Sequence, residues 1–247
     1  DELRKRMRGP RFHHVLIGDD FNASVVQRPL FGLMGFPRNY LVLGLPLLEA
    51  LPPSEALAVV AHEYGHLAGA HGRFGAFIYR LRISWGGVET MAEHWQGWGG
   101  RGLARLLHWF APRFNAYTFV LARSHEYLAD AASAELVGAP TARAALARAA
   151  VSGRRYGQFW QSQLAASERR PAPPERAYAA WGELAPQTPP AEQAQRFLRA
   201  ALAETTGSTD THPALTDRLA ALGAPPNTEL ELPGVGQVSA AQAWLNG

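Results

Sequence analysis

The 247-residue sequence contains no cysteine, so disulfide bonds and metal sites with thiolate ligands are excluded. No charge sign predominates either. The 24 lysines and arginines exceed the 21 aspartates and glutamates by only three, which argues against a nucleic-acid partner. No run of about 18 apolar residues occurs, so no segment is expected to span a bilayer by itself. What is present is 47% hydrophobic residues, enough to bury a substantial core.

The most informative motif is the pentapeptide His62-Glu63-Tyr64-Gly65-His66. Two histidines four residues apart on a helix share one face and can bind one metal ion, and neutral imidazoles suit Zn²⁺. Glu63 follows the first histidine and can take a proton from a metal-bound water. The alternative is a pair of core histidines satisfied by hydrogen bonds. The motif therefore predicts a zinc hydrolase site.

The residues before the motif predict a buried helix. Pro52 and Pro53 interrupt whatever precedes, and Ser54 is a good N-cap for a helix that begins at Glu55. Apolar residues surround the motif almost completely, which is typical of a core helix. Buried histidines and a buried glutamate need partners, and a metal ion would supply one.

A catalytic zinc ion usually has three protein ligands, so the motif requires one more. His71 is one candidate, because the longer metzincin pattern carries a third histidine shortly after the second. That pattern requires the histidine at position 72, which is glycine, and a later Met-turn for which no methionine follows Met91. His71 is better interpreted as a histidine at the C-terminal end of the helix, with Gly72 as its stop.

Glu126 is the second candidate for the third ligand. It lies in a stretch predicted to be helical from about Arg113 to Val137, opened by Pro112 and closed by Gly138. Glu126 and Asp130 are four residues apart and share a helix face. This spacing lets the glutamate bind zinc while the aspartate accepts a hydrogen bond from a ligating histidine, fixing its tautomer.

The two motifs together resemble a known family. His-Glu-Tyr-Gly-His followed by Arg123-Ser124-His125-Glu126-Tyr127-Leu128-Ala129-Asp130 is similar to the gluzincin membrane metallopeptidases typified by the heat-shock protease HtpX and the CAAX prenyl proteases. The resemblance implies a bacterial member's catalytic domain, with one Zn²⁺ per chain and a peptide or protein substrate. The family usually has Ser-Arg where this chain has Arg123-Ser124, which leaves the role of Arg123 open.

Further matches extend the resemblance over most of the chain. Asn22-Ala23 resembles the edge-strand pair that holds substrate in extended form. His212-Pro213 with Arg218 resembles the late His-Pro motif, in which the histidine faces the zinc and the arginine organises the site. The C-terminal sequence from Ser239 to Gly247 also looks like the close of bacterial members.

The implied mechanism places zinc on His62, His66 and Glu126, with Glu63 as the general base. His212 is either a donor to the developing oxyanion or a ligand that blocks the metal in a latent state, since a polar, flexible run precedes it. Two other functions remain open. The chain could be a slow-turnover chaperone or binding module with this fold, or a zinc hydrolase that does not act on peptides.

The expected fold is α+β and predominantly helical: a zincin (gluzincin) domain with a small β-sheet from residues 12–45 and an added helical subdomain. We expect a metallopeptidase core at residues 1–150, a helical subdomain at 151–205, and a C-terminal segment at 206–247 that completes the active site. The predicted helices beyond Ala139 are Thr141–Val151, Arg154–Arg169 and Ala191–Glu204.

Two features bear on a membrane. Arg4, Lys5, Arg6, Arg8 and Arg11 crowd the beginning of a chain that lacks an initiating methionine, which suggests a membrane-crossing segment before it. We therefore expect a protein anchored in a bacterial inner membrane with this domain cytoplasmic; a solvated basic tail is the alternative. Residues 73–121 are rich in aromatics and arginines, which suits a helical hairpin lying at a membrane interface or a lid over the cleft. An aromatic core packed on the zinc helices is the alternative.

Overall fold

The computed structural model describes residues 2–7, 9–29, 37–68, 98–168, 175–207, 212–225 and 238–245. It is predominantly helical with one small sheet, which confirms the α+β expectation. The strands are β1 (His14–Gly18), β2 (Ala23–Pro29) and β3 (Pro37–Gly44). β3 is central, parallel to β1 and antiparallel to β2, so β2 forms an edge among the described strands. All three lie within the predicted range of 12–45.

Two helices follow the sheet directly. They are α2 (Leu45–Ala50) and α3 (Pro53–Ala68), and α3 carries both motif histidines. The expected start at Glu55 with Ser54 as N-cap is wrong, because the carbonyl of Pro52 accepts the first bonds, from the backbone N–H groups of Glu55 and Ala56. Proline is favoured at the first helical position, where its missing N–H costs nothing.

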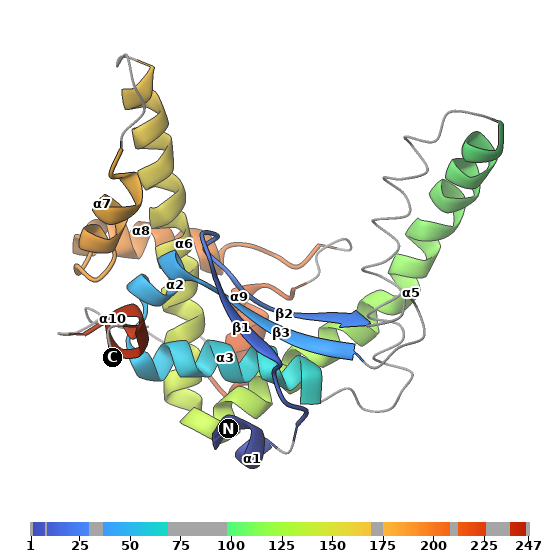
Figure 1. Ribbon diagram of the computed structural model, residues 1–247, viewed down its shortest axis with the longest axis horizontal. Coiled ribbons are helices and arrows are strands. Elements are labelled where there is room, and N and C mark those ends of the chain that lie inside the picture. The colour runs from blue at the N-terminus through green and yellow to red at the C-terminus, as the bar shows by residue number, and fades with distance from the viewer. Residues whose placement is uncertain are drawn as a thin grey trace.

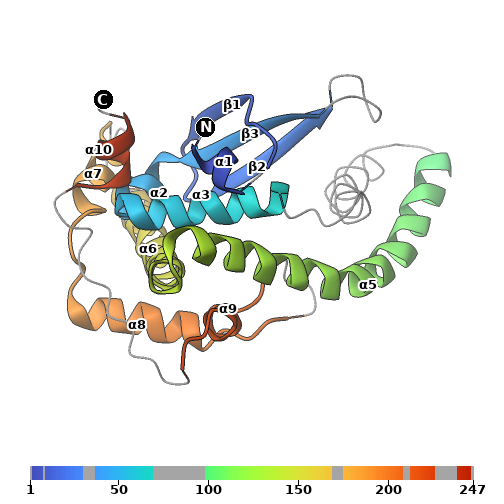
Figure 2. The ribbon, with the colours of Figure 1, turned by 90° about the horizontal axis from the view of Figure 1, so that it is seen from below.

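The helix that carries Glu126 is much longer than predicted. α5 runs from Trp98 to Val137 with Pro112 inside it, so the expected opening at Pro112 is wrong. Proline removes one helical hydrogen bond, which an exposed helix segment tolerates by bending. α5 bends in its N-terminal half (Figure 2). Its predicted end is confirmed: Gly138, at φ 89°, adopts a left-handed conformation and separates α5 from α6.

α6 (Ala139–Ser167) is one continuous helix, so the predicted break between Val151 and Arg154 is wrong. Ser152 and Gly153 are weak helix formers, but packing against α3, α5 and α8 outweighs that local preference. The boundary expected at 150/151 therefore falls inside a helix. The remaining helices in the described part of the chain are α1 (Glu2–Met7), α7 (Ala177–Leu184), α8 (Ala191–Leu202), α9 (Leu215–Ala221) and α10 (Ala240–Leu245).

The sheet lies on one side of α3, and α5 lies on the other (Figures 1 and 2). α3 and α5 approach closely at Gly65, where an added Cβ would lie only 3.0 Å from Ala129 Cα. α3 is joined to α6 by a buried ion pair, with Arg148 donating to Glu55 at 2.6 and 3.1 Å. α3 is therefore the central element, fixed on three sides.

The remaining predictions fall in part beyond the described residues. His71 and most of the aromatic segment at 73–121 lie there, and only the stretch from Trp98 onward is described. Among the described helices, none combines the length and apolar character needed to cross a membrane.

Candidate metal centre and active site

The two motif histidines converge as the sequence predicts. They lie one turn apart on α3, with His62 Nε2 3.1 Å from His66 Nε2. His62 is buried and His66 is largely so. Two imidazole lone pairs this close repel each other unless a proton or a metal ion lies between them. This pair is therefore built for a proton or a metal ion.

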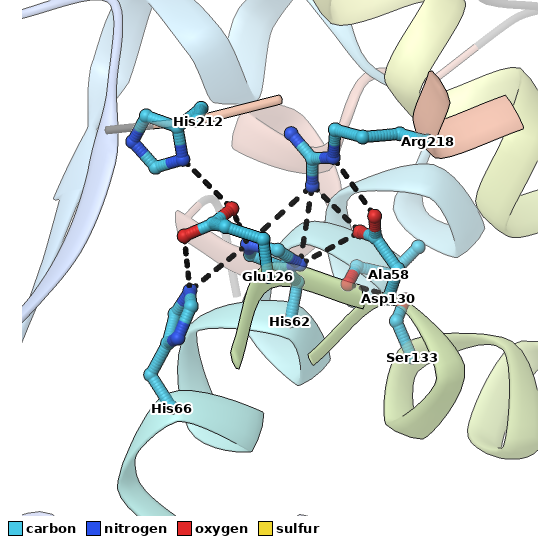
Figure 3. Close-up of polar contacts among 8 residues, drawn as sticks. All are labelled: Ala58, His62, His66, Glu126, Asp130, Ser133, His212 and Arg218. Atoms are coloured by element: carbon cyan, nitrogen blue, oxygen red, sulfur yellow. Dashed lines mark hydrogen bonds and ion pairs between the residues drawn. The ribbon is translucent and has the colours of Figure 1, made fainter. Parts of the chain in front are cut away.

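Glu126 approaches both histidines from α5. One carboxylate oxygen lies 3.5 Å from His62 Nε2 and the other lies 3.3 Å from His66 Nε2 (Figure 3). Two ligands of a tetrahedral zinc ion, each about 2.0–2.1 Å from the metal, are separated by about 3.3 Å. The nitrogen and oxygen donors present here, and their spacing, fit a metal of the zinc type.

Glu63 is a second carboxylate near the histidines. Its oxygen and the ring nitrogens of His62 and His66 all lie within 4.8 Å of one another, a cluster able to hold a metal ion. The contacts of Glu126 are shorter, at 3.3–3.5 Å, and approach the spacing that two ligands of one ion require. We therefore favour Glu126 over Glu63 as the third donor, which leaves Glu63 beside the centre.

Asp130 and Arg218 support His62 from behind. Asp130 lies 2.9 Å from His62 Nδ1 and accepts two hydrogen bonds from Arg218, at 2.6 and 2.8 Å. A proton on Nδ1, donated to Asp130, leaves the Nε2 lone pair directed at His66 and Glu126. Arg218 comes from α9, 156 positions after His62, and its guanidinium also lies 3.3 Å from Nδ1.

The surroundings of the two histidines shift their pKa values in opposite directions. Burial lowers the pKa of His62, but hydrogen bonds to Asp130 and Glu126 outweigh it and raise the pKa to about 9. Burial and the charge on His62 together lower the pKa of His66 to about 4. These pKa shifts favour a single positive charge on the pair near neutral pH, held on His62 between the two carboxylates.

The pKa values of Glu63 and Glu126 are also shifted in opposite directions. Burial raises the pKa of Glu63, which therefore keeps a proton more readily than an exposed glutamate. Burial also opposes ionisation of Glu126, but hydrogen bonds from His212 and His62 outweigh it and lower the pKa of Glu126. One carboxylate is suited to proton transfer and the other to remaining an anion.

His212 reaches the centre from the loop before α9. Its Nδ1 donates to Glu126 at 2.7 Å, while 60% of its side chain remains exposed (Figure 3). The loop is anchored by Thr206, whose hydroxyl accepts from the backbone N–H of Ala214 and donates to Asp217, both at 2.7 Å. Asp217 also binds Arg123 at 3.3 Å. Arg123 thus supports the His212 loop.

A cavity of about 380 Å³ opens onto the centre. His62, Glu63, His212 and Arg218 line it, together with Asn22 and Ala23 at the start of β2. The structure therefore brings together every site residue predicted from the sequence.

The sequence reasoning missed Ser133 and the lining residues on α6. The Ser133 hydroxyl donates to the carbonyl of Ala58 at 2.7 Å and ties α5 to α3 one turn before His62. Its spacing is the available signal, because position 133 follows Glu126 by seven residues and so lies on the same helix face. α6 carries no polar motif that would have drawn attention to it.

This helical fold, with His-Glu-x-x-His on one helix and a glutamate from another beside it, defines a metal-dependent hydrolase. The model of peptidase family M48 matches residues 21–225, and the chain belongs to this family of metallopeptidases. The match covers both site helices, β2 and α9. No curated protein and no solved structure matches the chain.

Proposed function

We propose that this metallopeptidase is a zinc-dependent endopeptidase with one zinc ion per chain, held by His62, His66 and Glu126. The convergence of three donors at 3.1–3.5 Å from one another carries the proposal. A bound zinc ion would polarise the substrate carbonyl and acidify a water. Asp130 would hold His62 in the ligating tautomer, and Arg218 would neutralise the charge of Asp130.

Glu63 is the proposed general base. It follows a ligand on α3 and faces the cavity in which a peptide carbonyl and a water would meet. Its raised pKa brings its proton affinity closer to neutral pH, which favours both taking the proton from water and delivering it to the leaving amine. His212 Nδ1, now bound to Glu126, is a donor that could turn to the developing oxyanion.

The start of β2 is the proposed site for the peptide backbone. β2 pairs with β3 alone among the described strands, and Asn22 and Ala23 line the cavity beside it. An extended peptide can add to such an edge through main-chain hydrogen bonds. This would position a scissile carbonyl along the cavity rim, near Glu63.

The decisive experiment compares the wild type with Glu63→Gln, each loaded with zinc. We expect one zinc per chain in both, cleavage of casein or a peptide pool by the wild type, and a loss of turnover of at least about 10²-fold in the variant. Glu135→Gln, at an exposed glutamate of α5 outside the centre, is the matched control and should cleave like the wild type. A wild type that holds zinc but cleaves no peptide contradicts the endopeptidase.

A latent, slow-turnover form is the second candidate, supported by the contact of His212 with Glu126. If His212 restrains the site, His212→Ala should cleave faster than the wild type; if it is a donor, the variant should be slower. Measuring kcat at equal zinc occupancy separates the two roles.

We also propose that the protein acts close to a membrane. Leu106, Trp109 and Val120 are 58–71% exposed on α5, with Arg105 and Arg113 beside them, a composition typical of helices at lipid interfaces. Co-flotation with vesicles containing anionic lipid tests this. Leu106→Glu combined with Trp109→Glu should reduce binding, and an unchanged bound fraction would contradict the contact.

A further inference from the structure

β1 lies at the edge of the sheet opposite the proposed substrate strand. Among the described strands it pairs only with β3, while β2, at the other edge, packs on α3 (Figure 2). Its three central residues are large and apolar, yet Val15 is 57% exposed and Leu16 and Ile17 are each 46% exposed. A continuous apolar run is typical of a strand that is covered on both faces. β1 therefore has the composition of an inner strand at the position of an edge strand.

The buried face of the sheet continues onto β1 but loses its cover there. The register places Val15 beside Leu41 and Ile17 beside Leu43, so these four side chains lie on one face. Leu41 and Leu43 belong to the core, whereas their neighbours on β1 are about half exposed. Leu16 adds an apolar side chain on the opposite face. A strand placed beside β1 would remove apolar surface from water on both faces, which stabilises the pairing.

The backbone of β1 is suited to such a strand. The N–H of His13 donates to the carbonyl of Asn39 at 2.8 Å, and the direction of these groups alternates along a strand. The N–H and C=O groups of His14, Leu16 and Gly18 therefore point away from β3. Edge strands usually avoid further pairing through a lysine, a proline or a bulge. β1 contains neither residue, and its register with β3 is continuous.

The two ends of β1 carry opposite charges. Arg11 is exposed before the strand, and Asp19 and Asp20 are exposed after it. Asn39 donates to the Arg11 carbonyl at 3.0 Å, and the Tyr156 hydroxyl donates to the Asp19 carbonyl at 3.2 Å, so both ends are held in place. An antiparallel second copy of β1 would bring the basic end of each strand to the acidic end of the other. A second copy of the chain thus complements β1 in charge as well as in apolar character.

We propose that β1 is a dimerisation strand. Two copies of the chain pair antiparallel along β1, across a twofold axis at Leu16, and their two sheets join into one. Leu16 then lies opposite Leu16 of the second copy, and Val15 lies opposite Ile17. β2 stays at the outer edge of each half, which leaves the proposed substrate strand open. The inference is independent of the proposed function, because it requires neither zinc nor peptide cleavage.

The first test is sedimentation of the whole chain from about 1 to about 200 μM, the range in which a small interface dissociates. We expect a reversible dimer in the wild type. Leu16→Lys and Leu16→Glu should each weaken it by at least about tenfold, because like charges then face each other across the axis. An equal mixture of the two variants should restore the dimer, since opposite charges then meet. Val26→Lys, at an exposed valine of β2, is the matched control and should dimerise like the wild type.

Thermal unfolding verifies that each variant is folded. A wild type that stays monomeric throughout the concentration range would overturn the proposal. It would also be overturned by a dimer that persists in Leu16→Lys, or by a mixture of the two charged variants that is no more dimeric than either alone.

The second test uses the absence of cysteine from the chain, which makes an introduced thiol unique. Directly paired residues of antiparallel strands have Cα atoms about 4.5–5.5 Å apart, within the range that a disulfide bridges. Leu16→Cys should therefore form a covalent dimer on mild oxidation. Leu164→Cys, at an exposed leucine of α6, is the matched control and should link at least about tenfold more slowly. Equal rates for the two variants would show that the thiols meet by random collision and would refute pairing at Leu16.

Discussion

At the scale of single residues, the centre depends on a few groups whose charges are set by their neighbours. Asp130 binds His62 on one side and Arg218 on the other, and both hydrogen bonds lower the pKa of Asp130 despite its burial. An aspartate held as an anion in this way is a permanent acceptor for the His62 Nδ1 proton. The arrangement holds the His62 ring in one orientation, with Nε2 available as a metal ligand.

Replacing Asp130 tests this role. We expect Asp130→Asn to weaken zinc affinity by about 10- to 100-fold, because the acceptor that orients His62 becomes a neutral amide. Competition with a chromophoric chelator measures the affinity. Glu135→Gln on the same helix should bind zinc like the wild type. Unchanged affinity in Asp130→Asn would show that His62 is oriented by other contacts.

Glu49, which lies outside the metal centre, should make the free energy of unfolding depend on pH. Burial raises its pKa to about 7, and its carboxylate packs over Gly182, where an added Cβ would lie 2.7 Å from Oε1. The folded-state pKa exceeds the unfolded value, so the folded protein binds this proton more tightly. The resulting stability is present below about pH 4.5 and is lost as the pH rises through about 7.

Glu49→Gln should therefore be more stable than the wild type at pH 8, and the difference should shrink or reverse at pH 5. Urea unfolding at the two pH values measures it. Because Glu49 is partly exposed, solvent screening reduces the effect. If the free energies of unfolding of the two proteins changed with pH in parallel, the raised pKa of Glu49 would be contradicted.

At the scale of helices, the centre requires α3 and α5 to pack closely. Gly65 lies between the two motif histidines of the helix, against Ala129 of α5, where an added Cβ would meet Ala129 Cα at 3.0 Å and Ala129 Cβ at 3.2 Å. Glu126 and Asp130 flank Ala129 on either side. The absence of a side chain at position 65 thus sets the distance between the histidines and the carboxylates.

Gly65→Ala should move the helices apart, weakening zinc binding and destabilising the fold by roughly 1–3 kcal/mol through overpacking. Gly157→Ala is the matched control, since an added Cβ there meets nothing within 4 Å. That variant should gain about 0.5–1 kcal/mol, the usual advantage of alanine in a helix. Urea unfolding measures the free energy of unfolding of each variant. Equal values would show that the close approach of α3 and α5 does not restrict the side chain at position 65.

Local sequence patterns were sufficient to predict each site helix but not how the helices meet. His62 and His66 share a face because of helical spacing alone, and Glu126 and Asp130 do so for the same reason. Nothing local determines that Ala129 packs on Gly65 or that Arg148 binds Glu55, since these contacts join segments 64 and 93 positions apart. The continuity of α6 past Gly153 likewise reflects packing that outweighs local preference, whereas α5 continues through the exposed Pro112 by bending.

At the scale of the whole molecule, the proposed metal ion would join α3 to α5. Ligands that bind only the folded state stabilise it, by about 4 kcal/mol when free zinc exceeds its dissociation constant a thousandfold. For a domain of this size each kcal/mol raises Tm by about 2–4 °C. The metal-loaded and metal-free forms should therefore differ visibly in thermal unfolding.

We expect a chelator to lower the Tm of the wild type by about 10 °C, with recovery on adding zinc. Glu63→Gln, which keeps the proposed ligands, should show the same shift. His66→Ala should unfold at one temperature regardless of chelator, because it lacks a ligand. A wild-type Tm that is insensitive to the chelator would contradict a zinc site that bridges the two helices.

The position of Arg218 along the chain has a consequence for biosynthesis. Arg218 lies 88 positions after Asp130, its partner. At the usual rate of translation, roughly 4–18 seconds separate the two residues as they are made. During that interval the growing polypeptide carries the histidines and Glu126 without the group that neutralises Asp130, and without His212. The peptidase centre is thus completed only once α9 has been made, well after the helices that carry the histidines and Glu126.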